Sequence, residues 1–237
     1  MLAAVGCVRS RDRNASRRPE RPRGGTSVKA FRVLIWAVLI GLSSGAQAAV
    51  RAENHFGSIH IDGKKAGHVH YTVEYGEQGD IETLKTRASL SVLGVKLFNF
   101  EQNLHEEWRA GDLHRMRSRT DDDGKIYEAS LERGPEVYKG VLNAKPVELT
   151  GKAFPASVWH HAIVRQSLLF DLMTLKPMKV KIARSDETMT IGNRKIPVER
   201  FDFSGDWEAT VWFDRNRKLA KFLYVVDGHK VTVQLDQ

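Results

Sequence analysis

Residues 59–75 read IHIDGKKAGHVHYTVEY, and this stretch decides the fold class. Its apolar residues occupy the odd positions: Ile59, Ile61, Val69, Tyr71, Val73 and Tyr75. Polar residues, among them His60, His68 and His70, fill most of the even positions, and Asp62-Gly63 marks a turn. A period of two is the spacing of a strand with one buried and one solvated face. The stretch therefore predicts a β-hairpin.

The same alternation extends along most of the chain that follows. It covers residues 84–108, with a break at Gly94, and residues 115–133, which turn at 120–125. After Pro177 it returns in six runs: Met178–Ile182, Thr188–Ile191, Ile196–Phe203, Ala209–Phe213, Lys218–Val226 and Lys230–Leu235. No linker or repeat interrupts residues 49–237. We predict one all-β domain, a single curved antiparallel meander or partial barrel with one short helical insertion.

The helical insertion is predicted where the alternation stops, after Pro155. Trp159, Ile163 and Phe170 fall at helical spacing, and residues 168–173 are more apolar than the packing of one short helix requires. We interpret this segment as a lid over a ligand site on the concave face of the sheet. Its candidate ligand-binding residues are Phe154, Trp159, Ile163, Phe170 and Met173. The alternative is that these side chains complete the core.

The first 48 residues have the features of an export signal. Lys29 and Arg32 precede an apolar run over 33–42, and Ala46-Gln47-Ala48 supplies the small residues of a cleavage site. The run is shorter than the roughly 20 residues that span a bilayer, so the mature form should carry no transmembrane anchor. We expect a periplasmic or extracellular protein after cleavage near Ala48. Residues 1–27 are long and Arg-rich for a signal, and we hypothesise that they are not translated.

Charge and cysteine content exclude several function classes. The chain has a net charge of +8, but residues 1–48 hold nine Lys and Arg against two acidic residues, which leaves +1 for the remainder. A nearly neutral domain has no overall attraction to nucleic acid. The only cysteine is Cys7. The predicted domain therefore has no disulfide, no cysteine-ligated metal and no cysteine nucleophile.

Three histidines are the strongest candidates for a metal site. His68 and His70 project from the same strand face, and His60 would join them across the hairpin. The spacing specifies no further ligand, so a solvated histidine face is favoured and no metal or other cofactor is predicted. A metal-dependent or Ser/His hydrolase acting on an envelope substrate remains an alternative, although no diagnostic motif orders such residues.

Several short motifs together resemble the exported bacterial family catalogued as domain of unknown function 6134, related to the group numbered 3108. The motifs include Asp62-Gly63-Lys64, Leu93-Gly94-Val95, Glu107-Trp108, Arg119-Thr120-Asp121-Asp122, Arg165-Gln166, Gly205-Asp206 and Trp212-Phe213-Asp214. The sequence departs from the family at Trp159-His160-His161, where the family pattern is Trp-Asn-Pro. The resemblance implies export and a β-rich fold, and it brings no activity.

These observations favour a non-catalytic envelope protein. Its expected partner is a lipid or another apolar or amphipathic small molecule, bound under the segment around Trp159. A structural or protein-binding module is the other alternative, and it would be favoured if the sheet enclosed no cavity.

The signal sequence leads to a test of processing. The exported protein should begin at Ala49, because the small residues before it suit signal peptidase. Amino-terminal sequencing of the exported protein checks this, and an exported form that begins before Val33 would contradict it.

Overall fold

A computed structural model describes residues 51–92, 95–226 and 228–236, and strands account for most of them. The first eight strands are β1 (Arg51–Ile61), β2 (Lys64–Gly76), β3 (Gly79–Val92), β4 (Val95–Arg109), β5 (Asp112–Asp122), β6 (Lys125–Arg133), β7 (Val137–Leu142) and β8 (Lys145–Thr150). The others are β9 (Phe154–Pro155), β10 (Leu168–Phe170), β11 (Pro177–Ile191), β12 (Arg194–Gly205), β13 (Ala209–Asp214), β14 (Leu219–Val226) and β15 (His229–Leu235). The predicted signal peptide lies outside the described residues.

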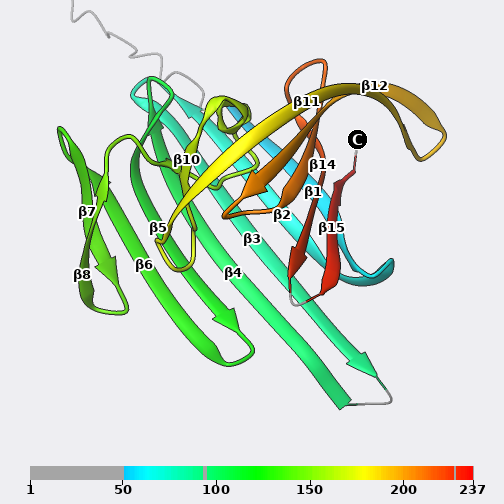
Figure 1. Cartoon of the computed structure of the whole chain (residues 1–237), viewed down its shortest axis with the longest axis horizontal. Helices are drawn as coiled ribbons and strands as arrows, with labels where there is room; N and C mark the ends of the chain where they lie inside the picture. Colours follow the sequence, from blue (N-terminus) through cyan, green and yellow to red (C-terminus); the bar gives the residue numbers. More distant parts are fainter. Residues whose placement is uncertain (1–50, 93–94, 227, 237) are drawn as a thin grey trace, which may run out of the picture. The chain divides into compact units, whose positions relative to one another are not determined.

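The fifteen strands of the described residues belong to one sheet, built from two meanders (Figure 1). The strand order is β8-β7-β6-β5-β4-β3-β2-β1-β15-β14-β13-β12-β11-β10-β9. Neighbours are antiparallel except β9 and β10, which run parallel. The meanders join where β1 pairs with β15, with Ile59 opposite Val233. The predicted fold class, a curved antiparallel meander, is therefore confirmed.

The hairpin of residues 59–75 forms as predicted, from β1 and β2. Asp62 and Gly63 make its two-residue turn, both with positive φ, a conformation that glycine adopts without a steric penalty. The Asp62 carboxylate also accepts a hydrogen bond from the backbone N–H of Lys230 at 2.9 Å, and its other oxygen lies 2.7 Å from His229 Nδ1. This turn therefore helps to hold β15 beside β1.

Two parts of the sheet differ from the sequence prediction. The runs Met178–Ile182 and Thr188–Ile191 belong to one continuous strand, β11. The hairpin of β7 and β8 was not predicted at all. Its turn residues, Asn143 and Ala144, both have positive φ, so the turn has the conformation of an Asn-Gly turn without a glycine.

The helical insertion is shorter than its apolar spacing suggested. A five-residue 3-10 helix, η1 (His161–Arg165), follows β9, and Phe170 lies in strand β10 rather than on a helix. Phe170 pairs with Pro177 of β11 and with Pro155 of β9. These pairings leave only one short turn of helix between the two strands. We call residues 154–175 the inner segment.

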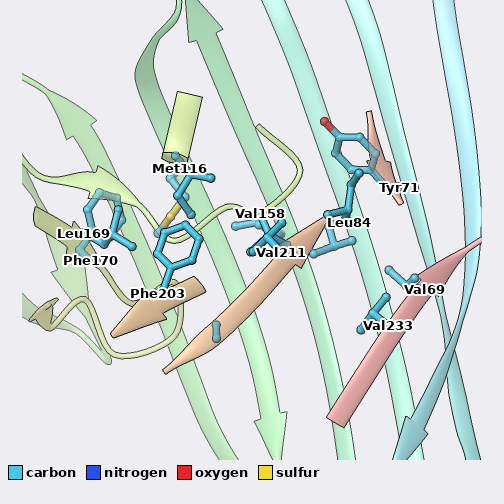
Figure 2. Close-up of a cluster of buried hydrophobic side chains, with 14 of the residues drawn as sticks. Val69, Tyr71, Leu84, Met116, Val158, Leu169, Phe170, Phe203, Val211 and Val233 are labelled. Carbon is cyan, nitrogen blue, oxygen red and sulfur yellow. The ribbon is translucent and has the colours of Figure 1, made fainter. Parts of the chain in front are cut away.

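The inner segment lies on the inner face of the curved sheet, between its two halves. Trp159 stacks on Tyr71 of β2 with ring centroids 4.7 Å apart, and His161 meets Phe213 of β13 at 4.8 Å. Figure 2 shows Val158 and Phe170 in one cluster with Met116 of β5 and Phe203 of β12. The main core therefore lies around the inner segment.

A second, smaller apolar cluster lies on the opposite face of the sheet. Its buried members are Ile191, Val198, Trp212 and Ala220. The indole N–H of Trp212 donates a hydrogen bond to Glu187 Oε2 at 3.0 Å. This contact ties the long β11–β12 hairpin to β13.

We expect Trp108→Ala and Trp212→Ala to lower the free energy of unfolding by about 3–5 kcal/mol each. Both rings are buried, with exposed fractions of 2% and 7%, so each substitution removes a large packed surface. Trp207, which is half-buried, is the matched control, and Trp207→Ala should cost clearly less. Denaturant unfolding of the three variants measures this. Equal losses in all three would contradict the assigned burial.

Candidate functional site

Two buried glutamates face each other on the inner face of the sheet. Glu82 of β3 pairs directly with Glu106 of β4, and their exposed fractions are 6% and 1%. Glu82 Oε2 and Glu106 Oε1 have no hydrogen-bond partner among the described residues. The salt bridges of the described chain do not include either carboxyl group. Two carboxyl groups this close, with no salt-bridge partner, disfavour ionisation of both at the same time.

The surroundings of the pair raise the pKa of both carboxyl groups. Burial, followed by the charge of Glu106, raises the pKa of Glu82 to about 8, while the Tyr71 hydroxyl acts in the opposite direction. Burial raises the pKa of Glu106 to about 7, and the Ser157 hydroxyl opposes this shift. Burial in turn raises the pKa of Tyr71 far above its usual range. Tyr71 therefore stays protonated and can donate to the pair.

Ser157 connects the pair to the inner segment. Its hydroxyl, which is fully buried, donates a hydrogen bond to Glu106 Oε2 at 2.9 Å. His160, three residues further along, stacks on Trp108 with ring centroids 4.1 Å apart. Burial lowers the pKa of His160, so its ring is neutral near pH 7. The segment thus contributes a hydroxyl and a neutral imidazole beside the two glutamates.

A cavity of about 260 Å³ opens beside Glu82. Tyr71, Trp159 and His160 line it, and Glu53, Asp80, Arg217 and Lys218 contribute charged groups to its wall. Glu53 Oε2 forms a salt bridge with Lys218 Nζ, 2.9 Å away. The cavity therefore combines aromatic rings with a buried carboxyl group.

A larger groove, of about 770 Å³, runs between η1 and the β11–β12 hairpin. Val164, Ile182 and Phe201 give it apolar surface. Four arginines also line it: Arg165, Arg184, Arg215 and Arg217. Arg184 pairs with Glu199 and Asp186, whereas the other three form no ion pair within the described ranges. Asp186, Glu187 and Glu199 also line the groove, and each of them pairs with Arg184 or Arg200. The groove is thus amphipathic, and three of its arginines form no ion pair among the described residues.

The five candidate lid residues have different environments. Ile163 and Phe170 are fully buried and pack in the core, and Phe154 and Met173 are half-buried. Trp159 is half-buried and lines the smaller cavity. The residues of the inner segment that line the larger groove are His161, Val164 and Arg165.

The three candidate metal ligands lie on the outer face of the hairpin. His68 is opposite Ser58, and His70 is opposite Phe56, on which it stacks at 4.4 Å. His60 is opposite Lys65. Across the ranges that the structure describes, no three His, Cys, Asp or Glu side chains gather to hold a metal ion. The hydrolase alternative requires these three histidines to converge with an acid in the concave site. Instead they lie on the outer face of the described hairpin.

Sequence reasoning did not identify Glu82, Glu106 and Ser157. A signal was nevertheless present, because Glu82 and Glu106 interrupt the apolar positions of their strands, with Leu84 and Leu104 two residues away. An acidic residue on the buried face of a strand is unusual and points to a special environment.

The glutamate pair predicts a loss of stability as pH rises. The folded chain holds protons on this pair up to about pH 7–8, whereas the unfolded chain loses them near the ordinary value of 4.5. Between these limits the folded state binds more protons, so the free energy of unfolding falls as pH increases. For one proton retained over this window we expect a loss of roughly 3–5 kcal/mol.

Denaturant unfolding as a function of pH, on the wild type and Glu82→Gln, isolates this effect from that of the histidines. The variant should lose less stability than the wild type across the window. Glu74→Gln, on the exposed outer face of β2, is the matched control and should follow the wild type. Parallel curves for the wild type and Glu82→Gln would contradict the assignment.

A comparison with solved structures identifies a protein of similar architecture. The chain is similar to a solved structure titled as a beta-barrel-like protein of the domain of unknown function DUF1849 from Brucella abortus, with a TM-score of 0.58 and 10% identity. The alignment covers 79% of this chain and 96% of that one, and at this identity the likeness concerns the fold alone. None of the curated proteins matches the chain.

A family model gives a closer assignment. The model described as "Domain of unknown function (DUF6134)" matches residues 58–236, which include almost the whole described sheet. This agrees with the resemblance seen in the short motifs. The chain belongs to the DUF6134 family.

Proposed function

We propose that this protein is exported and acts in the periplasm or outside the cell as a non-catalytic binder of an amphipathic molecule. The ligand we favour has an alkyl part and an anionic head. The larger groove, between η1 and the β11–β12 hairpin, is the binding site. The observation that carries the proposal is the combination of apolar surface and free arginines in this groove.

Size supports this choice of site. The groove volume of about 770 Å³ lies within the range of small-molecule sites. Phe201 is buried, and Val164 and Ile182 are half-buried, so an alkyl chain could cover these side chains and remove their remaining surface from water. Apolar contact of this kind contributes affinity without requiring a particular head group.

Charge supports an anionic head group. Arg165 and Arg215 are exposed, and neither forms an ion pair among the described residues. A guanidinium group offers planar, paired N–H donors that match a carboxylate or a phosphate. Burial lowers the pKa of His161 most, Arg217 and Arg165 lower it further and Glu199 raises it, so the positive field of the two arginines reaches His161. An anion in the groove would meet this field.

In this proposal the inner segment has a different role from the lid that the sequence predicts. It acts as a wall of the site rather than as a movable lid, because Ile163 and Phe170 are anchored in the core while Val164 and Arg165 line the groove. Among the described residues, no helix has the length and apolar character needed to cross a membrane. The export part of the proposal rests on the segment that ends near Ala48.

The groove predicts a preference for anionic amphiphiles. Dodecanoate should bind to the mature protein more tightly than dodecyltrimethylammonium, because the free arginines attract a carboxylate. The double variant Arg165→Gln/Arg215→Gln should bind dodecanoate about tenfold more weakly. Calorimetric titration below the micellar concentration measures both.

The matched control is Arg87→Gln/Arg119→Gln, which makes the same change of charge on the outer face of β3 and β5. Its dodecanoate affinity should stay close to that of the wild type. Equal weakening in both double variants would indicate a general charge effect and exclude the groove as the site. Undiminished affinity in Arg165→Gln/Arg215→Gln would exclude it as well.

A further inference from the structure

We propose that the cavity beside Glu82 is a second binding site, which takes a small organic ammonium ion and holds it on the Glu82 carboxylate. This site is separate from the groove in which we place the amphipathic ligand. The two share His161 and Arg217 in their walls, but Glu82 lines only the smaller cavity.

The buried carboxyl group of Glu82 is the first argument. More than nine-tenths of the residue is removed from solvent, it lines the cavity, and its Oε2 has no hydrogen-bond partner in the described chain. An unsatisfied buried acceptor is costly, and native structures seldom keep one without a reason. A cation that enters the cavity would meet the Glu82 carboxyl group, which has this unused acceptor.

The missing counter-ion is the second argument. Glu106 lies opposite Glu82 and accepts a hydrogen bond from Ser157, so the pair contributes negative charge when it ionises and never contributes positive charge. Asp80 lies two residues before Glu82 on the same strand, also lines the cavity, and forms no ion pair with any described residue. Asp80 and Glu82 thus line this end of the cavity, with Glu106 opposite Glu82 on β4, and none of the three carboxyl groups forms a salt bridge within the described residues.

The other charged groups around the cavity do not fill this role. Lys218 already forms a salt bridge with Glu53. His55, His160 and His161 each have a lowered pKa, caused first by burial, and are neutral near pH 7. Arg217 is exposed on the wall that the cavity shares with the groove. The charge that lacks a salt-bridge partner near Asp80 and Glu82 is therefore that of the carboxylates.

The shape and lining favour an organic ammonium over a metal ion. No three potential metal ligands converge among the described residues. The volume of about 260 Å³ exceeds what a bare ion needs and suits a small organic molecule. The rings of Tyr71 and Trp159 line the cavity and can contact both an alkyl chain and a cation. A primary ammonium can donate hydrogen bonds to Glu82 and Asp80 at the same time.

Binding of the cation should release a proton. Below about pH 7–8 the Glu82 carboxyl group holds a proton before the ligand arrives, and the ammonium stabilises the ionised Glu82 carboxylate in its place. One proton therefore leaves to solvent as one ammonium ion binds, and the charge of the buried site stays constant. This exchange gives the site a measurable signature that a nonspecific surface contact lacks.

The test uses n-butylammonium with the mature protein, and n-butanol as the uncharged ligand of similar shape. We expect saturable binding of the amine and none of the alcohol. Affinity should rise with pH by up to about tenfold per unit below the pH where the pair ionises, and level off above it. Calorimetry in two buffers of different ionisation enthalpy should show the release of up to one proton.

Glu82→Gln should lose the proton release and weaken butylammonium binding about tenfold or more. Glu74→Gln on the outer face is the control and should change neither. The circular dichroism spectrum and Tm of Glu82→Gln establish that the variant is folded. Unchanged amine affinity in a folded Glu82→Gln, absence of saturable amine binding, or equal binding of n-butanol would overturn the proposal. Dodecanoate binding should survive in Glu82→Gln, so failure of one site is distinguishable from failure of the other.

Discussion

The fold depends on filling the inner face of a sheet that curves without closing. A sheet of this kind has an apolar concave face that no second sheet covers. The inner segment supplies the missing layer, because its buried side chains contact both halves of the sheet. Burial of apolar surface is the main favourable term in folding, so this internal layer contributes a large part of the stability. The cavity and the groove are the places where the layer does not fill the curve.

The same constraint explains why a polar cluster survives in the interior. Short, irregular segments cannot satisfy all their backbone and side-chain polar groups with each other. Ser157 finds its partner on the sheet, in Glu106, whereas Asp171 accepts hydrogen bonds from the backbone N–H groups of Met173 and Thr174 within the segment itself. Such specific polar contacts determine how the segment is seated, whereas apolar contacts alone would tolerate several positions.

Much of the sheet could be predicted from the sequence, because strand alternation is a local signal. The hairpin around Asp62 and the all-β fold class followed from it, and some of the family motifs lie at or next to turns. Asp121, for example, accepts a hydrogen bond from Gly124 N–H at 2.7 Å within its turn. The site was harder to predict. The pairing of Glu82 with Glu106 depends on strand register, and the contact with Ser157 joins residues 51 positions apart. No local pattern encodes such a contact.

The pairing of β1 with β15 has a consequence for how the chain acquires its structure. In each of the two meanders, strands pair with a neighbour that is close in sequence, so each meander can assemble early. The strand pair that unites them joins residues about 170 positions apart and carries the greatest cost of loop closure. Until β15 arrives, one edge of β1 exposes unpaired backbone groups. The nascent chain must therefore stay free of other β-strand partners until nearly all of it is available.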